Sequence, residues 1–454
     1  MRILETIFRS LPLVCALVLM GHASTALAQP GRLGKEAPLP SLQPHKVLHA
    51  KENLFALSFT ADNSLLVTGG VGGKLAIWDT ADAKRIKNVE IPTGVLCDFA
   101  ITATDQLVAA TEGGDLYVYD LRTNNQVSKF TTGIDFRCMA VRHDEIVTGS
   151  ENGVVHQWDL KSDQPLSQSQ PIHERITAIS VASDGNRIAA GTLSGRLAIW
   201  DSIDKLPVVR AVANQVDMIE FHPNGESLAI GSRSGSMEFR DAKTLMISWR
   251  MPTQDDCRRT IAAFSLDGGY ILSTCLDREQ AKDEKTPTSN IEIYDTQTHT
   301  LAGRLLGQTG AVEAIEVSPD GKFVATATAD GAIAIWRSPF DVVDTIHLGI
   351  RRETISDQIE RAGQNRLTKV RLYRERAFLN ARMKQWKSAA NDFQNAKELA
   401  PHDTMHWMRA GVMLLLAKDM ASYREHAAEM LQRFELPPNA YAAERTAKLL
   451  VLPI

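Results

Sequence analysis

The sequence predicts a mainly β fold, built as a closed ring of seven small antiparallel sheets, followed by a small all-α region. A large side chain followed in most cases by Asp ends a short apolar stretch seven times, and runs of good helix formers take over after the seventh. The seven pairs are Trp78-Asp79, Tyr119-Asp120, Trp158-Asp159, Trp200-Asp201, Arg240-Asp241, Tyr294-Asp295 and Trp336-Arg337.

Each unit repeats the order strand, tight turn, strand, tight turn, strand. In the fourth unit the strands are Ile176–Val181, Arg187–Thr192 and Arg196–Trp200, and the turns are Ser183–Asn186 and Leu193–Gly195. Gly, Asn and Asp suit these turns because the favoured hairpin turns require positive φ. One unit cannot bury both of its faces, so we expect all seven to close into a ring.

The strand-end pairs recur at steps of 41, 39, 42, 40, 54 and 42 residues, and a period near 40 with such pairs resembles WD40 repeats. The resemblance covers residues 45–338 and is closer to divergent bacterial members than to regular eukaryotic ones. It implies a seven-bladed β-propeller. The Gly-His dipeptide of the family is absent, although His49 and His173 lie near the positions where its His would fall.

Residues 1–28 have the layout of a secretory signal peptide, with Arg2 and Arg9 before an apolar run and Ala26-Leu27-Ala28 at its end. We expect cleavage after Ala28 and a periplasmic or secreted protein. The apolar run is about half the roughly 20 residues that span a bilayer, which argues against stable membrane insertion after cleavage. Residues 29–44 are interpreted as a linker.

The chain has 454 residues and a net charge of −4, which argues against general nucleic-acid binding. Four cysteines remain after the signal peptide. Cys257 and Cys275 flank one predicted hairpin and could form a disulfide in an oxidising compartment, whereas Cys97 and Cys138 lie in different units. Buried free thiols are the alternative for all four. No Cys/His cluster has metal-ligand spacing, so no metal is expected.

Residues 339–365 are interpreted as a linker that contains a possible closing strand, Val342–Leu348. The stretch His45–His49 competes with it for the outermost position of the last sheet. The sequence leaves open which end of the chain closes the ring.

Residues 366–454 are predicted to be helical. Their packing positions resemble tetratricopeptide repeats, which are helix-turn-helix units of 34 residues. The first such unit is carried by Tyr373, Ala377, Trp386, Ala389, Phe393, Ala396 and Pro401, and a weaker second unit follows through Trp407, Ala410, Gly411, Tyr423 and Phe434.

The chain contains no GxSxG, HExxH, Walker-type or dinucleotide-binding motif. We therefore expect no catalytic residues and no cofactor, and a non-enzymatic scaffold that binds proteins or peptides. A propeller enzyme, such as a quinoprotein-like dehydrogenase or a hydrolase, is one alternative. An accessory protein for envelope assembly or transport is another.

Three surfaces are candidate binding sites. The first is the rim where the innermost strands begin, and the resemblance implies that this end receives peptides. Equivalent polar positions there are Asn53, Asp135, Arg175, Gln215 and Arg258. The second is the charged insertion Asp277–Asn290, which accounts for the step of 54 residues and joins the second and third strands of its unit.

The third surface is a basic stripe on the first repeat helix. Arg371, Arg374, Phe378 and Arg382 lie three, four and four residues apart and so share one helix face. In tetratricopeptide relatives such a face can line a groove that clamps an acidic peptide or its C-terminal carboxylate, a task that suits Arg. A solvated basic face is the alternative interpretation.

Overall fold

The computed structural model describes residues 41–92, 95–123, 125–142, 144–160, 164–212, 214–251, 257–277, 290–308 and 310–433. The described chain divides into two compact units, a β unit that ends at Phe340 and a helical unit that follows it. The predicted signal peptide lies outside the described residues.

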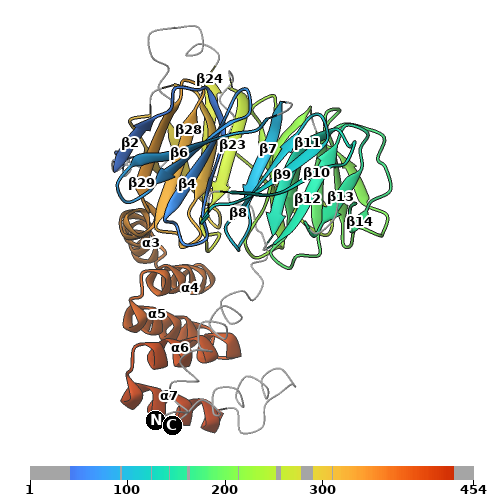
Figure 1. The fold of residues 1–454 in the computed structure, drawn as a ribbon. Coiled ribbons are helices and arrows are strands. Elements are labelled where there is room, and N and C mark those ends of the chain that lie inside the picture. The colour runs from blue at the N-terminus through green and yellow to red at the C-terminus, as the bar shows by residue number, and fades with distance from the viewer. Residues whose placement is uncertain are drawn as a thin grey trace, which may run out of the picture. The chain divides into compact units, whose positions relative to one another are not determined.

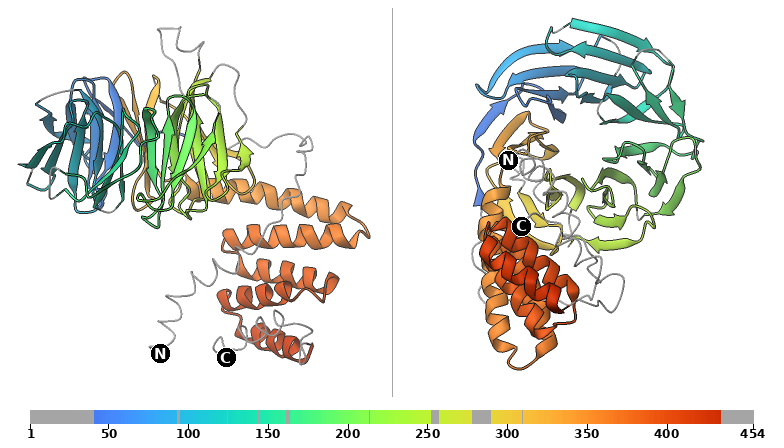
Figure 2. Two further views of the ribbon diagram at one scale, coloured as in Figure 1. Left: turned by 90° about the vertical axis from the view of Figure 1, so that its right-hand side faces the viewer. Right: turned by 90° about the horizontal axis from the view of Figure 1, so that it is seen from below.

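The β unit is a ring of seven sheets, the blades of a propeller, arranged around a common axis (Figure 1; right-hand view of Figure 2). Blade 1 holds β3 (Leu54–Phe59), β4 (Leu65–Gly70), β5 (Lys74–Asp79) and β6 (Lys84–Glu90); blade 2 holds β7 (Leu96–Ile101), β8 (Gln106–Thr111), β9 (Asp115–Asp120) and β10 (Asn125–Thr131); blade 3 holds β11 (Phe136–Arg142), β12 (Glu145–Ser150), β13 (Val155–Trp158) and β14 (Ser167–Gln168); blade 4 holds β15 (Ile176–Val181), β16 (Ile188–Thr192), β17 (Arg196–Trp200) and β18 (Val208–Ala211).

The remaining three blades complete the ring. Blade 5 holds β19 (Val216–Phe221), β20 (Ser227–Ser232), β21 (Met237–Asp241) and β22 (Ile247–Arg250); blade 6 holds β23 (Cys257–Phe264), β24 (Tyr270–Asp277), β25 (Ile291–Asp295), β26 (Thr300–Leu305) and β1 (Ser41–Leu42); blade 7 holds β27 (Val312–Val317), β28 (Phe323–Thr328), β29 (Ala332–Arg337) and β2 (Lys46–His49). The prediction of seven sheets is confirmed, and every predicted pair lies at the end of the third strand of a blade.

The amino-terminal strand closes the ring. In blade 7, β2 pairs antiparallel with β29, with Lys46 opposite Ile335 and His49 opposite Ala332. Just before it, β1 adds to the edge of blade 6 in parallel with β26. The alternative that Val342–Leu348 forms the closing strand is wrong, because this stretch is helical and runs into the following helix without a break.

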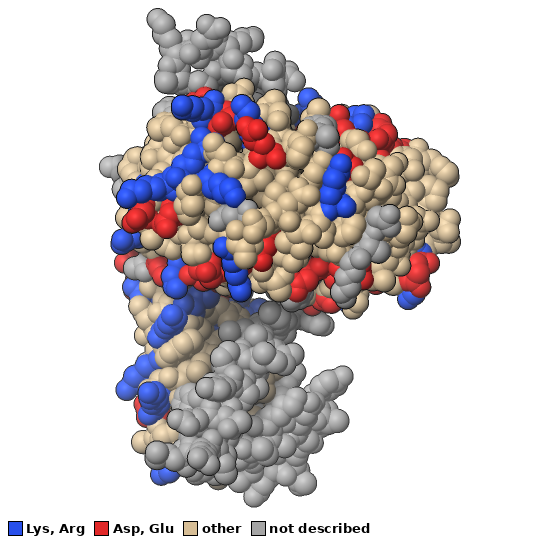
Figure 3. Space-filling model, viewed as in Figure 1, with Lys and Arg blue, Asp and Glu red and all other residues tan. Residues whose placement is uncertain are grey.

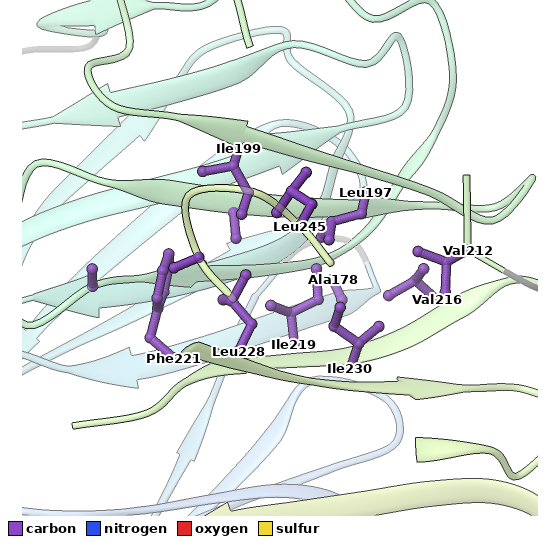
Figure 4. Close-up of a cluster of buried hydrophobic side chains, with 13 residues drawn as sticks. Ala178, Leu197, Ile199, Val212, Val216, Ile219, Phe221, Leu228, Ile230 and Leu245 are labelled. Carbon is purple, nitrogen blue, oxygen red and sulfur yellow. The ribbon is translucent and has the colours of Figure 1, made fainter. Parts of the chain in front are cut away.

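The core of the β unit lies between neighbouring blades. One buried cluster joins blades 4 and 5, with Leu197 and Ile199 of β17 packed against Ile219 of β19 and Leu245 of the last turn in blade 5 (Figure 4). Side chains alternate between the two faces of a strand, so each blade supplies apolar residues to both of its neighbours. Removing one blade would therefore expose two apolar interfaces.

The strand-end tryptophans differ in how their indole N–H groups are satisfied. Trp78 donates to the Thr68 hydroxyl at 2.9 Å, and Trp158 donates to the Thr148 hydroxyl at 3.0 Å. Trp200 and Trp336 are also buried, but their indole nitrogens have no hydrogen-bond partner among the described residues. The Thr–Trp pair is thus present in only some blades.

The helical unit is a row of helices in which each packs on the next in chain order (Figure 2). One buried core extends across four of its helices. It includes five of the packing positions named from the sequence, which are Ala377, Ala389, Phe393, Trp407 and Tyr423. The segments are α2 (Phe340–Val343), η2 (Asp344–Leu348), α3 (Gly349–Arg361), α4 (Arg366–Arg382), α5 (Trp386–Leu399), α6 (Thr404–Leu416) and α7 (Met420–Arg433).

Side chains cap two of these helices. Asn365 accepts a hydrogen bond from the backbone N–H of Thr368 at the start of α4, and Asp403 accepts one from Met405 at the start of α6. Such caps satisfy backbone N–H groups that have no partner in the first turn. None of the described helices is both long and apolar enough to cross a membrane.

Candidate functional site

The predicted rim residues occupy equivalent places in the ring. Asn53, Asp135, Arg175 and Gln215 each come directly before the innermost strand of a blade. The carbonyl of each accepts a backbone hydrogen bond from the residue that follows the second strand of the same blade. These donors are Val71 to Asn53 at 3.0 Å, Glu151 to Asp135 at 3.0 Å, Leu193 to Arg175 at 3.1 Å and Arg233 to Gln215 at 2.9 Å.

The hydrogen-bond donors form a second set of rim residues that the sequence analysis missed. A signal for them exists, since each comes one residue after the second strand in its repeat. Arg258 lies within β23, and its side chain is outside the described residues. The rim is therefore made of paired positions whose main chains are fixed while their side chains differ from blade to blade.

A chain of ion pairs crosses the rim from blade 2 to blade 4. The Arg137 guanidinium contacts Glu112 at 2.7 Å and Glu151 at 2.6 Å, and Arg175 contacts the same Glu151 oxygen at 2.5 Å. The hydrogen bond from Arg175 is the largest cause that lowers the pKa of Glu151 below its ordinary value. Sequence reasoning could not find this chain, because its members come from three different repeats.

The other blades give the rim a different character. Val71 in blade 1 is 66% exposed and Val95 in blade 2 is 56% exposed, so two neighbouring blades present apolar side chains. Arg233 in blade 5 is exposed, and no ion pair to it is found among the described residues. Gln215 in the same blade donates to Asp217 at 2.7 Å. An apolar portion and a charged portion thus lie on one rim.

Basic side chains gather elsewhere as well. Figure 3 shows Lys and Arg collected over the outer strands of blade 1, where β6 carries Lys84, Arg85 and Lys87. Arg85 pairs with Glu52 at 3.1 Å and lies over the Trp78 ring. Charged side chains on an edge strand oppose pairing with another chain, which is sufficient to explain their position.

Three acidic side chains lie on the innermost strands of the ring. Asp98, Glu220 and Glu316 lie on the innermost strands β7, β19 and β27, and each accepts a backbone hydrogen bond from the next blade around the ring. Burial raises the pKa of Asp98 to about 6, that of Glu220 to about 7 and that of Glu316 to about 8. Desolvation is the main cause in all three, and Glu220 raises the pKa of Glu316 further.

The predicted basic stripe lies on α4. Arg371 and Arg374 are exposed, and no ion pair to either is found within the described residues. Phe378 packs inward instead, with its ring edge-to-face against Phe393 at 5.4 Å and under the Arg409 guanidinium at 5.0 Å. Arg382 is half-buried. The structure thus presents the two arginines at the start of the stripe to solvent.

The cysteines divide into two pairs. Cys97 and Cys138 are free thiols in blades 2 and 3, and burial raises the pKa of both, that of Cys97 to about 12. Cys257 and Cys275 lie on the paired strands β23 and β24, where the register sets Cys257 opposite Asp277 and Cys275 opposite Thr260. Their side chains are outside the described residues, and a disulfide between them stays a prediction.

Two further predictions concern the insertion and metal binding. Residues 278–289 of the insertion lie outside the described residues, between the end of β24 and the start of β25. Within the described chain, no group of three or more His, Cys, Asp or Glu side chains is placed to hold a metal ion.

Comparisons with known proteins agree with this architecture. The profile described as "NUP159/214 beta propeller" matches residues 34–180, and the profile described as "WD domain, G-beta repeat" matches residues 165–201 and 296–337. A chain of the structure described as "Crystal Structure of Mitotic Checkpoint Complex" superposes with a TM-score of 0.57 at 18% identity, covering 70% of this chain and 98% of that one. At this identity the likeness concerns the fold alone.

Several curated relatives are 21% to 27% identical to this chain over their aligned residues. Autophagy-related protein 16 of Arabidopsis thaliana is 22% identical over 66% of this chain and 59% of its own length. The guanine nucleotide-binding protein subunit beta of Saccharomyces cerevisiae is 21% identical over 65% of this chain and 80% of its own length. The chain spans only 8% of a third relative, telomerase protein component 1 of Rattus norvegicus. Two segments of the chain, residues 165–201 and 296–337, thus match the WD40 repeat profile, and the chain forms a seven-bladed β-propeller.

Proposed function

We propose that this protein is a non-enzymatic, exported scaffold that binds other proteins through the propeller rim and through the basic surface of α4. The observation that carries the proposal is the construction of the rim. Main-chain hydrogen bonds hold Asn53, Asp135, Arg175 and Gln215 in equivalent positions, while the side chains vary. Rigid scaffolds that present variable loop residues are a common basis of recognition.

The relatives support a binding role rather than catalysis. One is named as a subunit of a guanine nucleotide-binding protein, and one structural neighbour belongs to a checkpoint complex. Both names describe assemblies of several proteins. Because a fold alone does not determine a function, the chemistry of the partner has to be inferred from the side chains of the rim.

The rim of this protein suits a partner with an apolar anchor and a charged flank. Val71 and Val95 provide exposed apolar surface in blades 1 and 2. The ion pairs of Arg137 and Arg175 with Glu151 neutralise much of the charge in blades 3 and 4. Central apolar contacts with polar surroundings are typical of protein interfaces.

Photo-crosslinking in the source cells tests the rim. A photoreactive amino acid replaces Asn53 or Gln215 on the rim, or Asn186 or Asn224 in the turns at the opposite ends of blades 4 and 5. We expect defined protein adducts from the two rim positions and none of the same adducts from the two turn positions. Identical adducts from both faces, or none from the rim together with a cofactor bound to the purified protein, would overturn the proposal.

Export is tested separately. The proposal rests on the charged start, the apolar run and the Ala26-Leu27-Ala28 end of residues 1–28. Mass spectrometry of the protein from fractionated source cells should find Gln29 as the first residue of the periplasmic or secreted form. An intact amino terminus in the cytoplasmic fraction would contradict export and would leave the rim proposal standing.

A further inference from the structure

The outer strand of blade 4, β18, is unusually apolar for an edge strand. All four of its residues are exposed, including Val208 at 44% and Val209 at 36%, and Leu206 just before it is 80% exposed. Apolar edge strands are ready to pair with another chain, and proteins usually protect them with charges or cover them. The exposed apolar residues of β18 therefore call for a functional explanation.

The main chain of β18 has hydrogen-bonding groups that face away from the sheet. β18 pairs with β17 alone and ends its sheet. The N–H of Val212 donates inward to the carbonyl of Gly195 at 2.6 Å. The backbone N–H and C=O groups of successive residues in a strand point to opposite sides. Those of Val208 and Arg210 therefore also point toward β17, and those of Val209 and Ala211 point away from the sheet.

Two other outer strands of this propeller are protected. In blade 1, β6 carries Lys84, Arg85 and Lys87. In blade 6, the edge strand β26 is covered by β1, an extended segment that pairs with it in parallel. The protein thus already accepts a fifth strand on one blade. On β18 the sole charged residue is Arg210, whose guanidinium donates to the carbonyl of Val209 at 3.0 Å.

Blade 5 also carries exposed apolar residues next to its outer strand. Val212, next to β18, and Leu245, in the last turn of blade 5, belong to one buried cluster (Figure 4). The residue after Leu245, Met246, is 72% exposed, and Ile247 is 38% exposed. Blades 4 and 5 thus each carry exposed apolar residues on or beside the outer strand, and exposed apolar surface is common at interaction sites.

We propose that the edge of β18 binds an extended segment of a partner protein as a fifth strand of blade 4. The outward N–H and C=O groups of Val209 and Ala211 pair with the main chain of this segment. The apolar side chains of the segment pack on Val209. A carboxylate of the segment forms an ion pair with the Arg210 guanidinium, which then no longer donates to the Val209 carbonyl. Main-chain hydrogen bonds supply affinity in this mode of recognition and alternate side chains supply specificity.

A synthetic peptide tests the proposal on the full-length mature chain. The probe is fluorescein-labelled acetyl-Thr-Val-Glu-Val-Thr-Val-amide, measured by fluorescence anisotropy. We expect saturable binding, and at least tenfold weaker binding when alternate backbone nitrogens of the peptide are methylated, because the side chains stay while the N–H donors are lost. Replacing the peptide Glu by Gln should weaken binding by roughly threefold, a loss of a charge-assisted hydrogen bond.

Variants of the protein locate the site. Val209→Pro removes one outward N–H while the inward pairing with β17 is kept, and Pro is tolerated at sheet edges. We expect it to weaken binding of the peptide at least tenfold with an unchanged melting temperature. Val209→Ala keeps the N–H group and should weaken binding less. The matched control is Asn88→Pro on β6, an exposed residue at an outward position of a charged edge, which should bind like the wild type.

Several results would overturn the proposal. These are absence of binding to the wild type, equal binding of the methylated peptide, and equal loss in Val209→Pro and Asn88→Pro. Because the rim residues are unchanged in all of these proteins, the outcome is independent of the crosslinking test of the rim.

Discussion

The backbone N–H of Phe59 in the first blade donates a hydrogen bond to the Glu316 carboxylate of the last blade at 3.5 Å, across the point where the ring closes. The Ser58 hydroxyl donates to the same oxygen at 3.3 Å, and the other Glu316 oxygen is buried and has no partner among the described residues. Because one of its oxygens has no hydrogen-bond partner, burying this carboxyl group costs less free energy when it is protonated than when it is charged.

The first prediction is that stability falls as pH rises. Burial raises the pKa of Glu316 to about 8 and that of Glu220 to about 7, above the ordinary value of 4.5. The folded state therefore binds more protons than the unfolded state between these values, and the stabilisation is fully present below about 4.5 and lost as pH rises through about 7 to 8. Denaturant unfolding between pH 5 and pH 8.5 measures this slope.

Glu316→Gln should remove much of that dependence. Gln keeps an oxygen that accepts the hydrogen bonds from Ser58 and Phe59 and carries no charge. We expect it to raise the free energy of unfolding by about 2 kcal/mol near pH 8.5 and to change it little near pH 4.5. Glu313→Gln on the same strand is the control, and the same pH profile in both variants would contradict the role of Glu316.

A second prediction concerns the buried indole of Trp200. In blades 1 and 3 a Thr ten residues before the Trp accepts the indole N–H, but blade 4 has Ala190 at this position. Ala190→Ser should place a hydroxyl at this position and raise the free energy of unfolding by about 1 kcal/mol. Thr148→Val in blade 3 should lower it by about 1 to 2 kcal/mol, because Trp158 loses its acceptor.

Chemical denaturation measures both of these variants. Opposite signs are the essential result. If Ala190→Ser destabilised the protein while Thr148→Val did not, the indole hydrogen bond would contribute nothing to stability, and packing alone would fix the tryptophans.

A third prediction separates backbone conformation from close packing. Gly153 has a φ of 79° and Gly185 one of 76°, so both adopt a conformation that costs other residues about 1 kcal/mol. A Cβ at Gly153 would also lie 2.6 Å from the carbonyl oxygen of Glu174, whereas a Cβ at Gly185 would meet no atom within 4 Å. Gly153→Ala should therefore lower stability by about 1 to 3 kcal/mol more than Gly185→Ala. Equal losses would show that the loop at Glu174 yields without cost.

Regular features of the fold could be predicted because they repeat. The strand-end pairs and the turn residues set the number of blades, and the same spacing placed Asn53 and Gln215 at equivalent positions. The ion pair between Arg137 and Glu112 could not be predicted, because it forms between residues of two repeats and depends on how blades face each other.

The sequence also could not predict which end of the chain closes the ring. Lys46–His49 and Val342–Leu348 are both short and partly apolar, and either could extend the sheet of blade 7. In the structure the second segment is helical, in continuity with α3. The segment contains no Gly or Pro that would interrupt a helix. Its tendency to continue into the helix outweighed the strand preference of its β-branched residues.

Phe378 shows the same limit within the helical unit. Helical spacing puts it on the face of Arg371 and Arg374, yet its ring packs on Phe393 and Arg409. Spacing gives the face of a helix but does not say how far a neighbouring helix covers it. The exposed part of the stripe is thus shorter than its sequence pattern.

The last prediction tests the two exposed arginines of α4. Arg371→Glu together with Arg374→Glu should weaken binding of an acidic peptide with a free C-terminal carboxylate by tenfold or more, because guanidinium groups bind carboxylates through paired hydrogen bonds. The melting temperature should stay unchanged, since no ion pair to either residue is found in the described structure. Isothermal titration calorimetry with the free peptide and with its C-terminally amidated form measures the effect. The control carries Arg361→Glu and Arg424→Glu, which make the same change in net charge at exposed positions of α3 and α7. If both double variants lost affinity equally, general attraction between opposite charges would explain the binding, and the clamp at Arg371 and Arg374 would be excluded.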